Sequence, residues 1–135
     1  MRKLSWVALF VALLWSPVLA DEPFKTVKTV NPNELASMMA SKPADLAICD
    51  ANGGSTRERY GVIPGARLLT SSTKYEVAEL PAAKDSKLVF YCANEQCMAS
   101  HAAAKRAIEN GYTNVAILPE GIMGWEKAGK PIAKP

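Results

Sequence analysis

Short apolar runs separated by longer mixed segments form the main pattern of the chain. Three of these runs predict strands, at residues 46–49, 88–91 and 115–118, and residues 67–69 predict a further short strand. Apolar runs without polar alternation are typical of strands that are buried on both faces of a sheet. Helical segments lie between them, so strands and helices alternate. This order predicts an α/β fold in which helices cover both faces of a central parallel sheet.

The expected helices differ in the strength of their signals. Residues 31–34 predict a helix start, because either asparagine can act as the cap and proline is tolerated in the first turn. Leu35, Met38 and Met39 then have the spacing of a buried helical face. We further expect a short helix that Ser55 caps, a weak one over residues 74–80, a long one over about 98–110, and a last one from Gly121.

The first 20 residues have the pattern of a secretory signal peptide. Arg2 and Lys3 precede an apolar stretch at residues 4–14, and small residues fit a cleavage site after Ala20. The stretch is too short to span a membrane comfortably. We therefore expect the protein to be exported, either to a periplasm or into the medium. The predicted parts are a signal peptide (1–20), an N-terminal extension (21–32), one domain (33–131) and a tail (132–135).

The formal net charge of +3 comes largely from this signal peptide. Without Arg2 and Lys3, 14 lysines and arginines remain against 13 acidic residues, so the 115-residue mature chain carries +1. There is no basic stripe, and we therefore expect no nucleic-acid partner. No second apolar segment is long enough to span a membrane, so we expect no stable membrane insertion after cleavage. The expected state is a monomer.

The strand at 88–91 leads into Cys92, and a short polar loop joins it to the long helix. A cysteine in this place lies near unpaired backbone N–H groups and the positive end of a helix dipole. That setting stabilises the thiolate, which is the reactive form, so Cys92 is the candidate nucleophile. Cys97, near the helix start, makes the loop either a redox pair or a nucleophile with a spare thiol.

Export also changes the interpretation of the three cysteines. An oxidising compartment favours disulfides, but an odd number leaves at least one cysteine unpaired within the monomer. Cys49 lies in the apolar run 46–49, and we expect it to be a small buried hydrophobic residue.

Several segments, taken in order, resemble a rhodanese-like, or sulfurtransferase, domain over roughly residues 33–131. Asp50 ends a strand near the start, and residues 61–66 (GVIPGA) resemble the family's turn. Residues 90–92 resemble the strand that leads into the active loop. Residues 111–115 and 121–129 resemble the closing strand and helix. The resemblance implies a rhodanese-like α/β fold with about five parallel strands.

The resemblance also implies a mechanism that needs no cofactor or metal. Cys92 would take a sulfane sulfur from a small donor such as thiosulfate or a persulfide, form a persulfide, and pass the sulfur to a thiol acceptor. The loop would surround this sulfur and turn backbone N–H groups toward it. Its six residues, counting both cysteines, match the loop length of sulfurtransferases rather than that of the related phosphatases. The implied site consists of the catalytic Cys92, the loop residues Ala93, Asn94, Glu95, Gln96 and Cys97, with Cys97 as candidate resolving thiol, and the supporting Asp50.

The chain departs from the family pattern in the turn, after the aspartate and in the loop. Val62 stands where the turn usually has histidine, and Asn52 stands where an arginine usually follows the aspartate by two positions. The loop has neither Arg nor Lys, and its Glu95 would repel thiosulfate and oppose a thiolate. Arg57 and Arg59 are cations that the sequence alone does not place.

Three other functions remain open. A thiol–disulfide redox or sulfur-binding module on the same fold would use Cys92 and Cys97, although their spacing is not that of thioredoxin-like proteins. Cys97 and His101 lie four residues apart on one helix face, and with Cys92 they form a set that suits a soft metal ion. An inactive interaction domain would use none of them. Loss of persulfide formation in Cys92→Ser but not in Cys49→Ser would select the sulfurtransferase.

Overall fold

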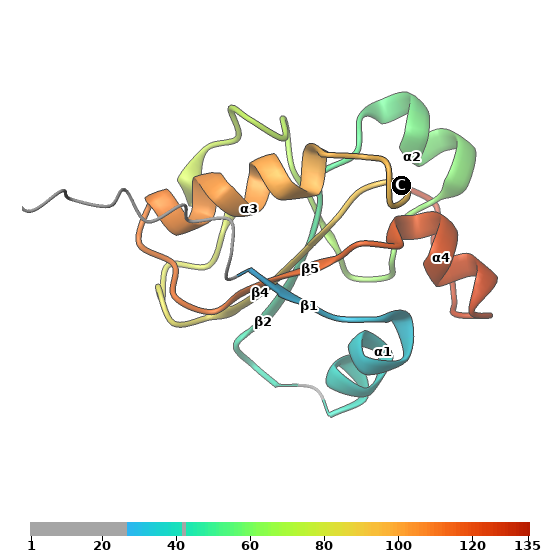
Figure 1. Cartoon of the computed structure of the whole chain (residues 1–135), viewed down its shortest axis with the longest axis horizontal. Coiled ribbons are helices and arrows are strands. Elements are labelled where there is room, and N and C mark those ends of the chain that lie inside the picture. Colours follow the sequence, from blue (N-terminus) through green and yellow to red (C-terminus); the bar gives the residue numbers. More distant parts are fainter. Residues whose placement is uncertain (1–26, 42) are drawn as a thin grey trace, which may run out of the picture.

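The computed structural model describes residues 27–41 and 43–135, and the predicted signal peptide lies outside them. Within these residues four α-helices and five strands are found, and helices alternate with strands as the pattern of apolar runs predicts (Figure 1). In chain order the elements are β1 (Lys28–Thr29), α1 (Pro32–Ala40), β2 (Leu46–Asp50), α2 (Gly54–Tyr60), β3 (Arg67–Leu68), the 3₁₀ helix η2 (Val77–Glu79), β4 (Lys87–Tyr91), α3 (Ala99–Glu109), β5 (Val115–Leu118) and α4 (Gly121–Lys127).

The five strands form one sheet in the order β1-β5-β4-β2-β3, and every neighbouring pair is parallel. β4 lies in the centre, between β2 and β5. The α/β class and the five-stranded parallel sheet are therefore confirmed. The two-residue edge strand β1 was not expected, and it pairs with β5 through Lys28 opposite Ala116.

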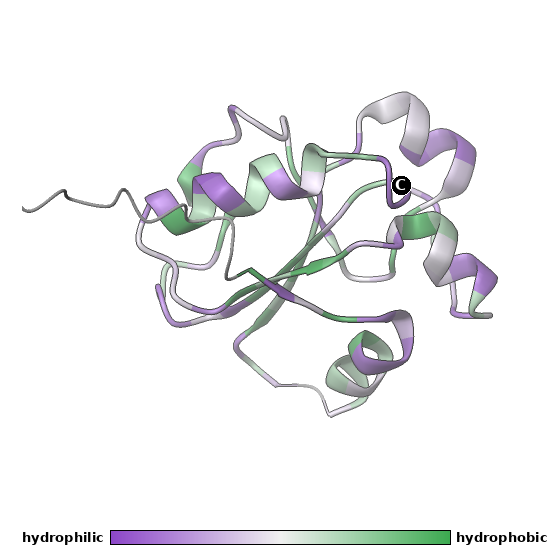
Figure 2. Ribbon diagram, viewed as in Figure 1, coloured by the Kyte–Doolittle hydropathy of each residue, from purple (hydrophilic) through white to green (hydrophobic). Residues whose placement is uncertain are grey.

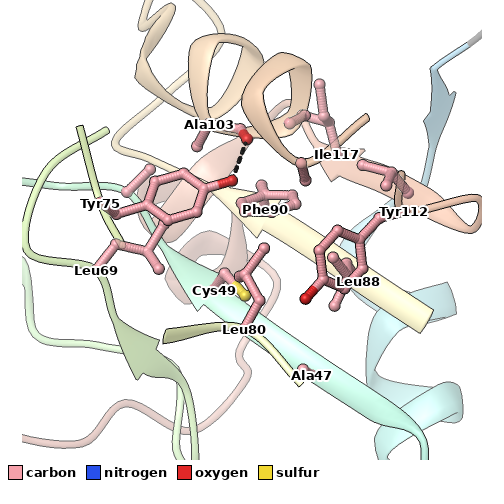
Figure 3. Packing of buried hydrophobic residues seen from close by; sticks show 14 residues of the cluster. Ala47, Cys49, Leu69, Tyr75, Leu80, Leu88, Phe90, Ala103, Tyr112 and Ile117 are labelled. Atoms are coloured by element: carbon pink, nitrogen blue, oxygen red, sulfur yellow. Dashed lines mark hydrogen bonds between the residues drawn. The ribbon is translucent and has the colours of Figure 1, made fainter. Parts of the chain in front are cut away.

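Side chains of the central strands alternate between two buried clusters, one on each face of the sheet. Cys49 and Phe90 face the cluster that α3 covers, together with Tyr75 and Leu80 (Figure 3). Ile48 and Val89 face the other cluster, to which α1 contributes Leu35 and α4 contributes Ile122 and Trp125. Burial on both faces explains why these strands have almost no polar positions. In Figure 2 the central strands are accordingly coloured as mainly hydrophobic, whereas α2 is mainly polar.

Two of the predicted helices differ from those observed. Within residues 74–80 only the short 3₁₀ helix η2 forms. Side chains near both ends of this segment form hydrogen bonds with residues outside it. The Tyr75 hydroxyl donates to the Ala103 carbonyl at 2.8 Å (Figure 3), and the Glu79 carboxylate accepts from the Thr70 backbone at 2.8 Å. The prediction that Ser55 caps α2 was wrong, since the helix already begins at Gly54 and Gly53 is its cap. For α1 the capping is as expected, with Asn31 accepting from the Glu34 N–H at 2.8 Å.

The carboxyl ends of β2 and β4 lie at the end of the sheet where α2, α4 and the start of α3 also lie (Figure 1). Parallel sheets place their ligand sites at this edge. The Ala51 N–H donates to the Tyr91 carbonyl at 2.9 Å, which holds the two strand ends together just before Cys92. Within the described residues, no helix has the length and apolar character needed to cross a bilayer.

Candidate active site

Cys92 follows β4 directly, and the start of α4 holds its backbone in place. The Ile122 N–H donates to the Cys92 carbonyl at 2.9 Å, and the Met123 N–H donates to the Ala93 carbonyl at 3.0 Å. Gly121 allows this close approach, because its φ is +63° and a Cβ atom there would lie 2.5 Å from the Cys92 oxygen. The loop is therefore anchored at its first two residues to another element of the fold.

Cys92 and Cys97 are joined by a disulfide, and their Cα atoms are 6.3 Å apart. The structure thus brings together the two thiols that the sequence singled out. Cys92 is 1% exposed, whereas Cys97 is partly exposed. The Sγ atom of Cys92 also lies 3.4 Å from the hydroxyl oxygen of Ser100, which is buried in the first turn of α3. In the reduced state this hydroxyl can donate to a Cys92 thiolate.

The loop between the cysteines is organised around Asn94. Its side-chain oxygen accepts from the Gln96 N–H at 3.1 Å, and its carbonyl accepts from the Cys97 N–H at 3.1 Å. We expected the loop N–H groups to face the sulfur, but in this oxidised loop these two are turned toward Asn94. Glu95 is exposed, so the acidic side chain lies on the outside of the loop.

Asp50, the expected supporting residue, has a fully buried carboxylate with several donors. The Tyr91 hydroxyl donates to Oδ2 at 2.5 Å, and the Asn52 N–H donates to Oδ1 at 2.8 Å. The Tyr91 oxygen in turn accepts from the Ile63 N–H at 3.1 Å, which ties the turn at residues 61–66 to the sheet. Burial, followed by the Asp50 charge, raises the pKa of Tyr91, so its hydroxyl stays a donor. The described contacts of Asp50 are those of a residue that holds the strand ends in position.

Arg57 is the cationic partner of Asp50, which the sequence did not reveal. Its Nε donates to the Asp50 carboxylate at 3.1 Å. One terminal guanidinium nitrogen donates to the Asp50 carbonyl at 3.0 Å and to the Leu69 carbonyl at 2.9 Å. A single side chain from α2 therefore links the ends of β2 and β3. Arg59, by contrast, lies over the ring of Tyr60, with 5.3 Å between its guanidinium carbon and the ring centroid.

Cys49 is a free, fully buried thiol, as its apolar run predicted. Burial raises the pKa of this thiol to about 12. It is packed against Leu80 and Phe90 on the face of the sheet that α3 covers (Figure 3). A thiol that stays protonated and has no access to solvent is not a nucleophile, which leaves Cys92 and Cys97 as the candidate reactive cysteines.

A pocket of about 500 Å³ lies between the loop and α4. The loop contributes Asn94, Glu95 and Gln96, and the other wall contains Glu120, Met123 and Lys127. The Asn94 amide lies 3.6 Å from the Met123 sulfur and so connects the two walls. Neither Glu120, Met123 nor Lys127 was singled out from the sequence, because the pocket depends on the packing of α4 against the loop.

A metal site does not emerge from the part of the chain that the structure describes. No three His, Cys, Asp or Glu side chains gather there as a group that could hold an ion. The sulfur atoms of Cys92 and Cys97 are bonded to each other. The set of Cys92, Cys97 and His101 that we considered therefore carries no argument for a metal.

The profile of the Rhodanese-like domain family matches residues 31–128, a segment that begins just before α1 and ends just after α4. The chain belongs to the rhodanese-like domain family. A search of the curated proteins finds no match.

Solved structures with the rhodanese fold are similar to this chain. A Rhodopseudomonas palustris protein of unknown function, described as a possible tyrosine phosphatase, is 27% identical with a TM-score of 0.67, over 81% of this chain and 86% of its own. A 3-mercaptopyruvate sulfotransferase from Escherichia coli is 20% identical with a TM-score of 0.63, over 82% of this chain and 51% of its own. A thiosulfate sulfurtransferase from Pseudomonas aeruginosa is also 20% identical, with a TM-score of 0.63, over 81% of this chain and 20% of its own. At 20% identity these two sulfurtransferases show the fold alone.

This chain has no arginine two residues after Asp50, and the cation that pairs with Asp50 comes from another position. Asn52 occupies that position, and its side-chain amide nitrogen is buried without a hydrogen-bond partner. The guanidinium arrives instead from Arg57, five residues later. The buried charge of Asp50 is therefore still paired in this rhodanese-like domain.

Proposed function

We propose that this rhodanese-like protein is a sulfurtransferase or sulfane-sulfur carrier that forms a persulfide on Cys92 and resolves it with Cys97. The observation that carries the proposal is the pairing of Cys92 and Cys97 in the loop that follows β4. The family profile supports it, and sulfurtransferases are among the structural neighbours.

The first step loads the sulfur. The thiolate of Cys92 attacks the sulfane sulfur of a donor, a sulfur–sulfur bond forms, and the donor leaves as a thiol or sulfite. The negative charge on the persulfide is stabilised by neutral hydrogen-bond donors, for which the Ser100 hydroxyl, 3.4 Å from Cys92 Sγ, is placed. An acceptor thiol can then take the outer sulfur and regenerate the thiol of Cys92.

The second step is open to this protein because of Cys97. Its thiolate attacks Sγ of Cys92, the bond to the outer sulfur breaks, and that sulfur leaves as hydrosulfide. The sulfane sulfur gains two electrons, which the two thiols lose as they become a disulfide. Two equivalents of an external thiol return the pair to the reduced state. The chain then releases sulfide when no acceptor is present.

Mass spectrometry of the intact reduced protein tests this function. Incubation with a persulfide donor should add one sulfur to Cys97→Ser and none to Cys92→Ser, and a separate incubation with thiosulfate compares the two donors. Cys49→Ser keeps both loop cysteines and should behave as the wild-type protein does. The wild-type protein should release sulfide and end as the Cys92–Cys97 disulfide. Sulfur loading that persists in Cys92→Ser would refute the assignment.

The disulfide itself favours a second candidate, a thiol–disulfide redox module with little sulfur transfer. In that case the reduced protein would take up no sulfur from any donor but would lose two hydrogens on oxidation. Titration against a glutathione redox buffer should then give a reduction potential in the range of catalytic dithiols. A pair that cannot be reduced and reoxidised reversibly would exclude this candidate.

Export remains part of the proposal. The residue pattern up to Ala20 supports cleavage before Asp21, and an oxidising compartment suits a disulfide. N-terminal sequencing of protein recovered from an expressing bacterial host tests it. A first residue of Asp21 in the periplasmic or secreted fraction is the expected result, and an uncleaved chain would contradict it.

A further inference from the structure

The pocket between the loop and α4 has a charge pattern that points to a particular class of donor. Glu95 comes from the loop, Glu120 precedes α4, and Lys127 ends it. Within residues 27–41 and 43–135, no salt bridge joins any of these three to another side chain. The pocket thus presents two carboxylates and one ammonium group that the protein itself leaves uncompensated.

One wall of the pocket consists of residues that lie between Cys92 and Cys97, although neither cysteine lines the pocket. Asn94, Glu95 and Gln96 line the pocket, and Cys92 and Cys97 flank them on either side. The other wall is anchored to this loop, because the N–H groups of Ile122 and Met123 donate to the carbonyls of Cys92 and Ala93. A molecule in the pocket therefore lies against the loop that holds the two cysteines.

We propose that the pocket binds a small aminothiol persulfide of the cysteine type, and that this is the donor which loads Cys92. Its ammonium group binds between Glu95 and Glu120, and its carboxylate binds Lys127. The volume of about 500 Å³ is ample for such a molecule. The inference rests on the proposed function, and it adds a reason why thiosulfate, a dianion, is a poor donor: two carboxylates repel it.

Three donors that differ by one charged group test the proposal on the reduced full-length protein. Cysteine persulfide carries both groups, 3-mercaptopropionate persulfide lacks the ammonium, and cysteamine persulfide lacks the carboxylate. We expect cysteine persulfide to load Cys92 about tenfold faster than the 3-mercaptopropionate analogue, as two partly solvated ion pairs together can supply. The advantage should shrink as salt is raised, because the charges are near the surface.

Variants assign the preference to named side chains. Glu95→Gln combined with Glu120→Gln should bring the rate ratio of these two donors close to one. Lys127→Gln should instead remove the preference for cysteine persulfide over cysteamine persulfide. Glu126→Gln is the matched control, since Glu126 is exposed on the same helix α4 but does not line the pocket. It should leave both ratios unchanged.

The outcomes separate this inference from the proposed function. Equal loading by all three donors, unchanged in the variants, would overturn the donor class and leave the persulfide chemistry standing. If no donor loads Cys92, the proposed function fails. Whether the pocket binds a ligand of the cysteine type is then decided by a binding measurement that needs no sulfur transfer. An NMR titration with unreactive S-methylcysteine should shift the amide signals of Glu95 and Lys127, while 3-(methylthio)propionate should not. Equal shifts with both compounds, or none with either, would overturn the pocket assignment.

Discussion

Replacement of Arg57 by methionine tests how the candidate site is held in place. The change keeps most of the length of the side chain but removes its charge and all of its donors. Three hydrogen bonds are lost, to the Asp50 carboxylate, the Asp50 carbonyl and the Leu69 carbonyl. The Asp50 side chain has no exposure to solvent, so the substitution leaves a buried acidic group without its cationic partner.

Breaking a buried ion pair by removing one partner costs about 3–5 kcal/mol. The Arg57 side chain is 14% exposed, so the lower half of that range is the appropriate expectation. A loss of about 3 kcal/mol is a large fraction of the 5–15 kcal/mol by which a domain is typically stable. Arg57→Met should therefore lower the free energy of unfolding by about 3 kcal/mol, and urea denaturation followed by tryptophan fluorescence measures it.

Two further variants make the test specific. Arg59→Met removes an exposed arginine from the same helix and should cost less than about 1 kcal/mol, the value of an exposed cation–π contact. Asp50→Asn in the Arg57→Met background removes the stranded charge, so the double variant should lose less than the sum of the single losses. If Arg57→Met costs no more than Arg59→Met, or if the double variant is additive, the ion pair does not hold the strand ends.

Three other changes have expected results that follow from single contacts. Gly121→Ala should destabilise the protein more than Gly129→Ala and should slow sulfur loading. Both glycines have positive φ, but only a Cβ atom at position 121 would lie 2.5 Å from the Cys92 backbone oxygen. Urea denaturation curves with equal midpoints for the two variants would contradict this. Tyr91→Phe leaves an Asp50 oxygen and the Ile63 N–H without their hydrogen-bond partner. The free energy of unfolding should fall by about 1–3 kcal/mol in the same assay. A loss below about 0.5 kcal/mol would show that these hydrogen bonds are dispensable. Burial raises the pKa of Cys49 from 9.0 to about 12, so above pH 9 the unfolded chain loses a proton that the folded chain keeps. The free energy of unfolding should therefore fall by up to about 1.4 kcal/mol per pH unit between pH 9 and pH 12. Cys49→Ala should show a shallower decline between pH 8 and 10, and an equal decline would exclude Cys49 as the cause.

The central sheet was predictable because its strands are buried on both faces and therefore read as uninterrupted apolar runs. Residues 46–49, 88–91 and 115–118 correspond closely to β2, β4 and β5. β1 escaped prediction because both of its residues, Lys28 and Thr29, are exposed, and its place depends only on backbone pairing with β5. The predicted helix at 74–80 shortened to η2 because Tyr75 is used as a buried bonding partner of α3, which periodicity does not show.

The candidate site, like the fold, was predictable from the sequence only in part. The short loop, with five positions of separation, made a close approach of Cys92 and Cys97 plausible, but the spacing alone left open whether they form a disulfide. The partner of Asp50 could not be predicted, because seven positions and a change of direction lie between Asp50 and Arg57. Because the two arginines leave α2 in different directions, Arg57 is partly buried against Asp50, while Arg59 is exposed. Likewise Glu120 and Lys127 become part of the pocket only through the hydrogen bonds that hold α4 to the loop.

The position of Arg57 has a consequence for the chemistry of the loop. Its charge is paired with the Asp50 carboxylate, and its other hydrogen bonds go to two backbone carbonyls rather than to the sulfur of Cys92. The loop contains no Arg or Lys of its own, and Glu95 adds a negative charge on its outer side. A Cys92 thiolate or persulfide must then depend on neutral dipoles, from Ser100 and from the N-terminal end of α3. Neutral dipoles stabilise a singly charged sulfur but give an approaching dianion no counter-charge. The absence of loop cations is therefore compatible with the proposed persulfide chemistry on Cys92, and we expect it to act against dianionic donors such as thiosulfate rather than against sulfur transfer itself.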